Sequence, residues 1–324
     1  MVNHYSTREV TMGFFIFKRV LQAILVLWLA FTVTFVLLFI IPGDAALARM
    51  GTEASLTPAQ IEELRTSLGL NRPLYVQYFD ALFGIIQGDL GTSLRTGRPV
   101  AEMLGAAIPH TLTIAALALV VSVVVGFGLA VAAVYTRMYW LRSFLLALPA
   151  VGVSVPTFWV GLMLLSVFAF GLGWFPSFGS SSGPAALVLP VITLAVVPSS
   201  MIAQVLAGSL ESARTAPYAY TAYAKGASRL RVIVIHCLRN ASISTLTLTG
   251  LLTGGLLTGA VVTESVFSRA GLGRVILEGV QTVDLTVVQG VVLVGAVVFV
   301  AVNLLVDLAY PLIDPRIRRS KSIG

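Results

Sequence analysis

The chain has 324 residues, of which 57% are hydrophobic and only 11% are charged, and its mean hydropathy is +0.94. Soluble domains carry about a quarter charged residues, so this composition excludes an ordinary water-soluble enzyme or binding protein. The formal net charge of +7 does not indicate nucleic-acid binding, because the basic residues flank apolar stretches and do not interleave with aromatic residues.

Six long stretches of the chain contain no Asp, Glu, Lys, Arg or His. They cover residues 20–41, 111–135, 143–173, 185–210, 241–263 and 285–306. Each is longer than the roughly 20 residues that a helix needs to cross a 30 Å hydrocarbon core, and a helix satisfies the backbone polar groups that lipid cannot satisfy. The sequence therefore predicts an all-α integral membrane protein with six transmembrane helices.

The first apolar stretch, 20–41, is predicted to be a transmembrane helix rather than a cleaved signal peptide. Its apolar core is too long for a signal peptide, and Pro42-Gly43-Asp44 follows in place of a small-residue cleavage site.

The distribution of Lys and Arg predicts the orientation in the membrane. With six spans, 14 of the 21 Lys and Arg residues fall on the side that carries both termini. Five of the other seven lie in the long connection 42–110, where the positive-inside rule is weak. The segment 1–19 and the basic tail 311–324 are therefore predicted to be cytoplasmic, and 42–110 is predicted to be an extracytoplasmic loop.

This extracytoplasmic loop is long enough to contain short helices. Thr57-Pro58-Ala59-Gln60 is typical of a helix N-terminus, and Gly69 can end that helix. A second helix is predicted to begin near Pro73 and to end at Gly88-Asp89-Leu90-Gly91. We expect these helices to lie at the membrane surface, and a dedicated ligand site is the alternative.

Residues 111–310 are predicted to form the transmembrane core, with the five remaining spans. The third and fourth spans contain prolines, which free backbone groups and bend helices; they are Pro149, Pro156, Pro190 and Pro198. Such prolines are tolerated in helix packing or beside a water-lined conduit, and the sequence leaves both interpretations open.

The fifth span carries a threonine face and several glycines. Thr245, Thr249 and Thr253 are four residues apart, so they share a face that either packs against a neighbour or lines a polar path. Gly250 and Gly254 form a small-xxx-small pair that permits close helix approach. These five residues are the candidates for a pore lining or for helix packing.

The sequence indicates a protein without catalytic chemistry of its own. The phosphate-binding motif GxxxxGK[ST] is absent, so the chain is not expected to bind and hydrolyse ATP by itself. The metal and redox motifs HExxH and CxxC are absent as well. His4, His110 and His236 are far apart and are predicted to lie on different sides of the membrane, so a shared metal site is not expected. The single cysteine, Cys237, excludes a disulfide within the chain. We predict no catalytic, cofactor or metal residues.

The predicted cytoplasmic connection 211–240 is the most informative segment. Tyrosines and alanines alternate in it up to Lys225-Gly226, which predicts a short helix that is ended by the glycine. A helix of this kind can insert into a groove of a partner protein. An ordinary basic, membrane-anchoring loop is the alternative.

This connection resembles the cytoplasmic loop of permease subunits from binding-protein-dependent ABC importers. In the general loop pattern of that family, Ala222 matches the second alanine and Leu238 the leucine, while Tyr220 replaces the glutamate. The resemblance is closer to the branch of dipeptide, oligopeptide and nickel permeases, and it is carried by Ala222-Tyr223-Ala224-Lys225-Gly226 and His236-Cys237-Leu238-Arg239-Asn240-Ala241.

The resemblance to this branch extends over nearly the whole chain. Further similar segments are 42–44, 69–74, 88–93, 155–159, 264–267, 271–273, 303–307 and 314–316. Two positions depart from the family: Arg269-Ala270 precedes Gly271 where a proline is usual, and Tyr223 stands where Arg is common.

The resemblance implies a type I ABC importer permease fold and half of a translocation pathway for peptides or a similar small solute. Such a chain couples to separate ATPases through its cytoplasmic loop, and the residues carried over to this role are Ala222, Ala224, Lys225, Gly226, Arg229, His236 and Leu238. The implied partners are a second, homologous permease in a heterodimer, two ATP-binding subunits that hold ATP and Mg, and an extracytoplasmic solute-binding protein. The implied location is a bacterial or archaeal cell membrane.

Two other functions are kept as alternatives. An ion-coupled secondary transporter is expected to have inverted repeats and ionisable residues in the middle of its spans, and the sequence has neither. A non-transporting membrane scaffold would not need the Ala-Lys-Gly helix. The solute is left open among dipeptides, oligopeptides, nickel chelates and other small molecules.

Overall fold

The computed structural model describes residues 12–40, 66, 71–93, 95–177 and 183–313 of the chain. The helix expected at Thr57 and the terminal segments 1–11 and 314–324 lie outside these residues.

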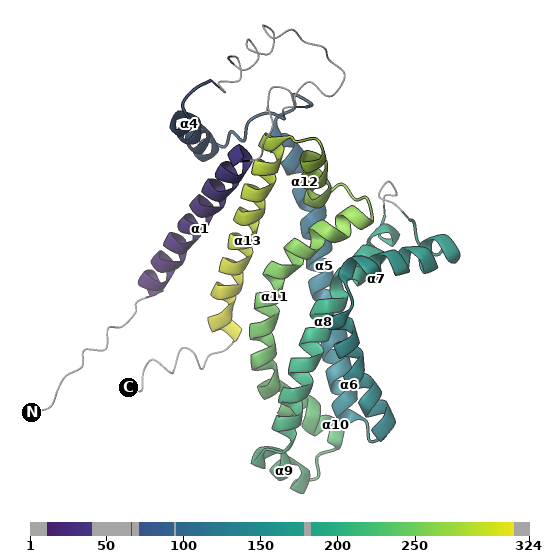
Figure 1. The fold of residues 1–324 in the computed structure, drawn as a ribbon. Coiled ribbons are helices and arrows are strands. Elements are labelled where there is room, and N and C mark those ends of the chain that lie inside the picture. Colours follow the sequence, from purple (N-terminus) through teal and green to yellow (C-terminus); the bar gives the residue numbers. More distant parts are fainter. Residues whose placement is uncertain (1–11, 41–65, 67–70, 94, 178–182, 314–324) are drawn as a thin grey trace, which may run out of the picture. The chain divides into compact units, whose positions relative to one another are not determined.

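Within the described part of the chain, the regular structure is helical apart from one isolated β-bridge between Thr92 and Pro99. The α-helices, labelled in Figure 1, are α1 (Met12–Ile40), α4 (Leu74–Ile86), α5 (Val100–Tyr135), α6 (Tyr139–Ser154), α7 (Thr157–Leu164), α8 (Ala185–Arg214), α9 (Pro217–Ala224), α10 (Arg229–Arg231), α11 (Leu238–Val266), α12 (Leu272–Gln281) and α13 (Leu285–Ile313). Two π-helical segments, η1 (Leu165–Gly171) and η2 (Val232–Cys237), extend α7 and precede α11.

The six apolar stretches correspond to helices of membrane-spanning length. Among the described residues, five helical spans are long and apolar enough to cross a bilayer: 17–37, 100–135, 185–214, 229–266 and 285–305. The pair formed by α6 and α7 with η1 makes a sixth if the two are counted as one span. The prediction of an all-α membrane protein is therefore confirmed.

The third apolar stretch is not one straight helix. α6 and the helix from Thr157 to Gly171 meet at an angle of 105°. Pro156 has no N–H to continue the helix, and it forces the preceding Val155 into an extended conformation, with φ −91° and ψ 130°. The bend expected from the prolines is therefore a complete break at Pro156, while Pro149 remains inside α6.

The described residues form two compact units. The first comprises the residues up to Ile108 together with Arg274–Leu304, and the second comprises Pro109–Gly273 with the end of α13 from Leu305.

In the first unit, α4 packs on α1 through aromatic side chains, and Leu293 of α13 is buried in the same hydrophobic cluster. The rings of Phe31 and Phe35 on α1 each lie 5.3 Å from the ring of Tyr78 on α4, and the Tyr78 hydroxyl lies 2.8 Å from the Thr32 Oγ1. The loop after α4 is fixed to the start of α13, because the buried Ser93 hydroxyl donates to Asp284 Oδ2 over 2.5 Å. The helix expected after Pro73 is thus present, and it packs on the long apolar helix α1.

In the second unit, α8 is the central helix. More than half (56%) of its most apolar window is buried, compared with 28% for the span 229–266. Pro190 and Pro198 are both buried inside α8 without ending it. Small residues let the neighbours approach closely: a Cβ on Gly126 of α5 would lie only 2.6 Å from the Ile202 side chain. This packing makes α5, α6, α7, α8 and α11 one close-packed body.

Candidate functional site

The connection 211–240 folds as a compact helical loop at one end of α8 and α11 (Figure 1). The chain leaves α8 at Arg214, forms the two-turn helix α9, reverses through Lys225-Gly226 and re-enters the body through α10 and η2. Pro217 occupies the first turn of α9, where its missing N–H leaves no hydrogen bond unmade. The predicted short helix is therefore present over Pro217–Ala224.

Gly226 ends α9 in the conformation that favours glycine. Its φ is +82°, in the left-handed region. Its N–H donates to the Tyr223 carbonyl over 2.9 Å, and the Ala227 N–H donates to the Ala222 carbonyl over 3.1 Å. This pair of bonds is a Schellman motif, so Gly226 sets the point at which the loop turns back.

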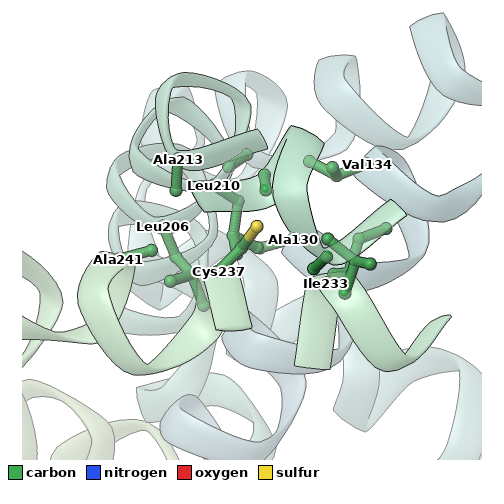
Figure 2. Close-up of a cluster of buried hydrophobic side chains, with 12 residues drawn as sticks. Ala130, Val134, Leu206, Leu210, Ala213, Ile233, Cys237 and Ala241 are labelled. Carbon is green, nitrogen blue, oxygen red and sulfur yellow. The ribbon is translucent and has the colours of Figure 1, made fainter. Parts of the chain in front are cut away.

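The inner face of α9 is formed by two buried alanines. Ala219 and Ala222 belong to a hydrophobic cluster with residues of α5, α8, η2 and α11 (Figure 2). Its other buried members are Ala130, Val134, Leu206, Ala207, Leu210, Ala213, Val232, Ile233, Cys237 and Ala241. In Figure 2 the Cys237 sulfur lies among Leu206, Leu210 and Ala130. Ala222, one of the predicted coupling residues, therefore faces the body of this chain.

The outer face of α9 and the turn after it are exposed. Tyr220 is 63% exposed, and Tyr218, Thr221, Ala224, Lys225 and Gly226 are exposed as well. Two further large apolar side chains of the same loop, Leu230 and Ile235, are 51% and 56% exposed. Of the predicted coupling residues, Ala224, Lys225, Gly226 and the exposed His236 are accessible to a partner.

Arg229 links the loop to the end of α5. Its Nη2 donates to the Val134 carbonyl over 2.9 Å, and its guanidinium lies 5.9 Å from the centre of the Tyr135 ring. The side chain is half-buried, as is Leu238, which packs against the hydrophobic cluster of α9. Both residues belong to the set predicted to couple the loop to an ATPase, and in the structure they hold the loop to its own chain.

A second contact, between charged residues, holds the end of α8. Glu211 pairs with Arg214, one turn later, over 2.5 Å and with Arg142 of α6 over 3.2 Å. These side chains are 29–40% exposed, so solvent weakens the pairs. The contact with Arg142 is one that the sequence did not reveal, because 69 residues separate it from Glu211.

The threonine face of α11 satisfies its hydroxyls within the helix. The Thr249 and Thr253 hydroxyls donate to the carbonyls four residues before them, over 2.8 and 2.9 Å, and the buried Thr245 lies 3.5 Å from its own such partner. Gly250 and Gly254 are buried in the same helix. These residues remain candidates for helix packing or a pore lining.

A group of three His, Cys, Asp or Glu side chains able to hold a metal ion is not found in the part of the chain that the structure describes.

Two sequence families account for most of the chain. Residues 122–319 match the family described as "Binding-protein-dependent transport system inner membrane component", and residues 12–115 match the corresponding N-terminal family.

Relatives of similar length were also found. The "Dipeptide transport system permease protein DppB" of Alkalihalophilus pseudofirmus is 36% identical, over 93% of this chain and 98% of that protein. The "Glutathione transport system permease protein GsiC" of Salmonella typhimurium is 35% identical, over 94% of this chain and 98% of that protein.

A solved structure, titled "Crystal structure of an amino acid ABC transporter with histidines", is similar in fold, with a TM-score of 0.50. The similarity covers 66% of this chain and 94% of that chain at 16% identity, so it bears on the fold alone.

Proposed function

The chain belongs to the family of binding-protein-dependent transport system inner membrane components, and on this premise we propose that it forms half of the translocation pathway of an ATP-driven importer of peptides or a similar small solute. As a permease it is a multi-pass membrane protein and not itself an enzyme. The choice of peptides rests on relatives that are named for dipeptide and glutathione transport.

The proposed partners follow from the family and from what the chain lacks. The family is defined by dependence on a binding protein, which we place on the extracytoplasmic side. The chain has no phosphate-binding loop of its own, so ATP and Mg would be held by two separate ATP-binding subunits. A second, homologous permease would complete the pathway. Both termini would be cytoplasmic in a bacterial or archaeal cell membrane, in keeping with the excess of Lys and Arg on their side.

The two faces of α9 are the observation that carries this proposal. One face is fixed in the hydrophobic cluster by Ala219 and Ala222, and the exposed side presents Tyr218 and Tyr220 to solvent, next to Lys225 in the turn that follows. An exposed aromatic and basic face on a short helix is suited to a groove on a partner protein. We therefore assign the ATPase contact to this outer face rather than to the alanines.

The cluster beneath α9 supplies a route for mechanical coupling. It joins α9 to α5, α8 and α11 through close-packed side chains, and close-packed interiors transmit displacement rather than absorb it. A movement of α9 imposed by the ATPases would therefore move these membrane helices. ATP can shift the transporter between inward-facing and outward-facing states only if the ATPases bind α9 differently in the two states.

The test compares two exposed tyrosines. Tyr220→Ser removes the aromatic side chain from the outer face of α9, and Tyr139→Ser removes one that is 85% exposed at the start of α6, outside the loop. Loss of a central interface tyrosine costs about 2 kcal/mol, or roughly 30-fold in affinity. We expect Tyr220→Ser to lose peptide uptake and co-purified ATPase, and Tyr139→Ser to keep both. Normal uptake and normal ATPase recovery in Tyr220→Ser would contradict the assignment.

A further inference from the structure

A carboxylate is fully buried at the end of α11 that is opposite to α9. Glu264 has no exposed surface, and its neighbour Thr263 is 1% exposed. Charged side chains are almost never fully buried unless they are paired or hydrogen-bonded. The group that donates a hydrogen bond to the Glu264 carboxyl group therefore indicates the role of this end of α11.

The turn that follows α11 brings the chain back beside Glu264. α11 ends with Ser268 at φ +49°, the Ser268 N–H donates to the Ser265 carbonyl, and the Arg269 N–H donates to the Glu264 carbonyl over 2.9 Å. The Arg269 side chain donates to the Ala186 carbonyl at the start of α8 over 3.1 Å. The turn is thus bound to two membrane helices before α12 begins.

The first turn of α12 receives its hydrogen-bond acceptors from other helices. The first N–H groups of a helix have no acceptor within the helix, and Gly271, just before α12, has no side chain to supply one. Instead the Leu272 N–H donates to Thr111 Oγ1 of α5 over 2.9 Å, and the Gly273 N–H donates to Glu264 Oε2 over 2.7 Å.

Two glycines make room for these contacts. A Cβ on Gly271 would overlap the Glu264 carboxyl group, and a Cβ on Gly273 would overlap the backbone of Val261. Because neither position can carry a side chain without displacing the carboxylate or the helix, Gly271 and Gly273 belong to the same arrangement as Glu264 and Thr111.

We propose that Glu264 and Thr111 are positioning residues that clamp the first turn of α12 to α11 and α5, so that the turn 267–273 moves with these helices during transport. The role in transport rests on the proposed function, under which this turn lies on the extracytoplasmic side that receives solute. Neither residue touches the solute in this proposal; they act by holding backbone.

The experiment uses two matched pairs of variants of the full chain in lipid nanodiscs. Glu264→Gln and Thr111→Ser keep an acceptor, whereas Glu264→Leu and Thr111→Val remove it with little change in size. Glu102→Leu, at a carboxylate that is 63% exposed and paired with Arg98, is the control. Hydrogen exchange is followed in peptides that cover 267–281 and in peptides from the middle of α8.

We expect exchange in 267–281 to be at least about tenfold faster in Glu264→Leu and Thr111→Val, and unchanged in Glu264→Gln, Thr111→Ser and Glu102→Leu. The α8 peptides should exchange at the wild-type rate in all variants. Wild-type exchange at 267–281 in both acceptor-free variants, or equal acceleration in α8, would overturn the clamp. If Glu264→Leu fails to fold, the exchange rate of Thr111→Val alone tests the clamp, because this variant keeps the Glu264 carboxyl group.

The role in transport is tested by measuring ATPase activity in the assembled importer. In Glu264→Leu and Thr111→Val we expect basal ATPase activity to persist and its stimulation by the solute-loaded binding protein to fall at least about tenfold, with recovery in Glu264→Gln and Thr111→Ser. Wild-type stimulation in the acceptor-free variants would overturn this role. A wild-type chain that imports no peptide would instead overturn the proposed function, and the exchange results, which need no solute, would still decide the clamp.

Discussion

Four helices in the described part of the chain end with the same pair of backbone hydrogen bonds, two of them on glycine and two on a residue with a side chain. α4 ends on Gly88 at φ +83° and α9 on Gly226 at φ +82°, whereas α11 ends on Ser268 at φ +49° and α12 on Val283 at φ +53°. A residue with a Cβ pays about 1–2 kcal/mol for this conformation, and glycine does not. The α9 loop is therefore relaxed, and the turns after α11 and α12 are strained.

The strained turns are each held by a buried carboxylate. Glu264 lies beneath the turn of Ser268, and Asp284, which is 3% exposed, directly follows Val283 and accepts from Ser93 and from the Val287 N–H. A residue keeps a backbone conformation that it disfavours only when contacts in the surrounding structure hold it there. The turn after α9 has a glycine at this position, which adopts the conformation without strain, so the two kinds of helix end should respond differently to substitution.

The largest effect is expected from Gly226→Val. A Cβ at Gly226 meets nothing within 4 Å, so the variant tests the backbone conformation alone. A β-branched residue in the left-handed region should cost about 2 kcal/mol or more and unwind the end of α9. We expect at least about a tenfold loss of uptake, with normal amounts of the chain in the membrane.

The control for Gly226→Val is Gly208→Ala in α8. This glycine also has open space around its Cβ position but has an ordinary helical φ, so alanine should be neutral or stabilising by about 0.5–1 kcal/mol. Gly226→Asn should retain most of the uptake, because Asn tolerates the left-handed region. Wild-type uptake in Gly226→Val would show that the turn does not matter for coupling.

Gly271→Ala should be the next largest effect. The added methyl group collides with the buried Glu264 carboxyl group, and overpacking of this kind costs about 1–3 kcal/mol. Thermal unfolding in detergent should show a clear fall in the apparent Tm. Gly105→Ala, where a Cβ meets nothing within 4 Å, is the control and should leave the apparent Tm nearly unchanged; equal falls in both variants would argue against the collision.

Val283→Gly is expected to stabilise the protein. It removes about 1–2 kcal/mol of backbone strain and loses part of that gain through the greater freedom of glycine in the unfolded chain. The net gain should be about 0.5–1 kcal/mol, seen as a small rise in the apparent Tm. The matched Val280→Gly, at the next-to-last residue of α12, keeps the helical backbone conformation and should lower the apparent Tm, because glycine in a helix costs about 1 kcal/mol. A fall in both would mean that the turn is not strained.

The smallest effect is expected from Arg142→Ala. It removes the pair with Glu211 between α6 and α8, whose side chains are 40% and 37% exposed, so the loss should be below about 1 kcal/mol and should shrink at high salt. Arg98→Ala, which breaks an exposed pair with Glu102, is the comparison. A loss in Arg142→Ala well above that in Arg98→Ala would indicate a stronger structural role for the contact between α6 and α8.

The sequence predicted the features that depend on neighbouring residues. Uninterrupted apolar runs predicted the spans, and Lys225-Gly226 predicted the end of α9. Both predictions succeeded because the residues that determine each feature lie within it or beside it. Pro156 predicted a bend, and the structure has a break of 105° there. The size of that bend depends on what α7 packs against, which is α8 and α11, and local sequence does not contain this information.

The features that depend on distant residues were not predicted. The alternation of alanine and tyrosine in α9 indicates two faces, yet it does not say that Ala219 and Ala222 are the ones that face α5 and α8. In the sequence, Glu264 is simply the first charged residue after a span. Its burial follows from the hydrogen bonds at the start of α12, where the second acceptor, Thr111, lies 161 residues from Leu272.

The cluster beneath α9 has a practical consequence for measuring this loop at work. Cys237 is the only cysteine of the chain, and its thiol is fully buried there, below the helix that carries the exposed tyrosines. The native protein therefore carries its own chemical probe of this loop. Any step that moves α9 away from the membrane helices exposes this single thiol, so the alkylation rate of Cys237 should report how often α9 moves away, without an engineered label.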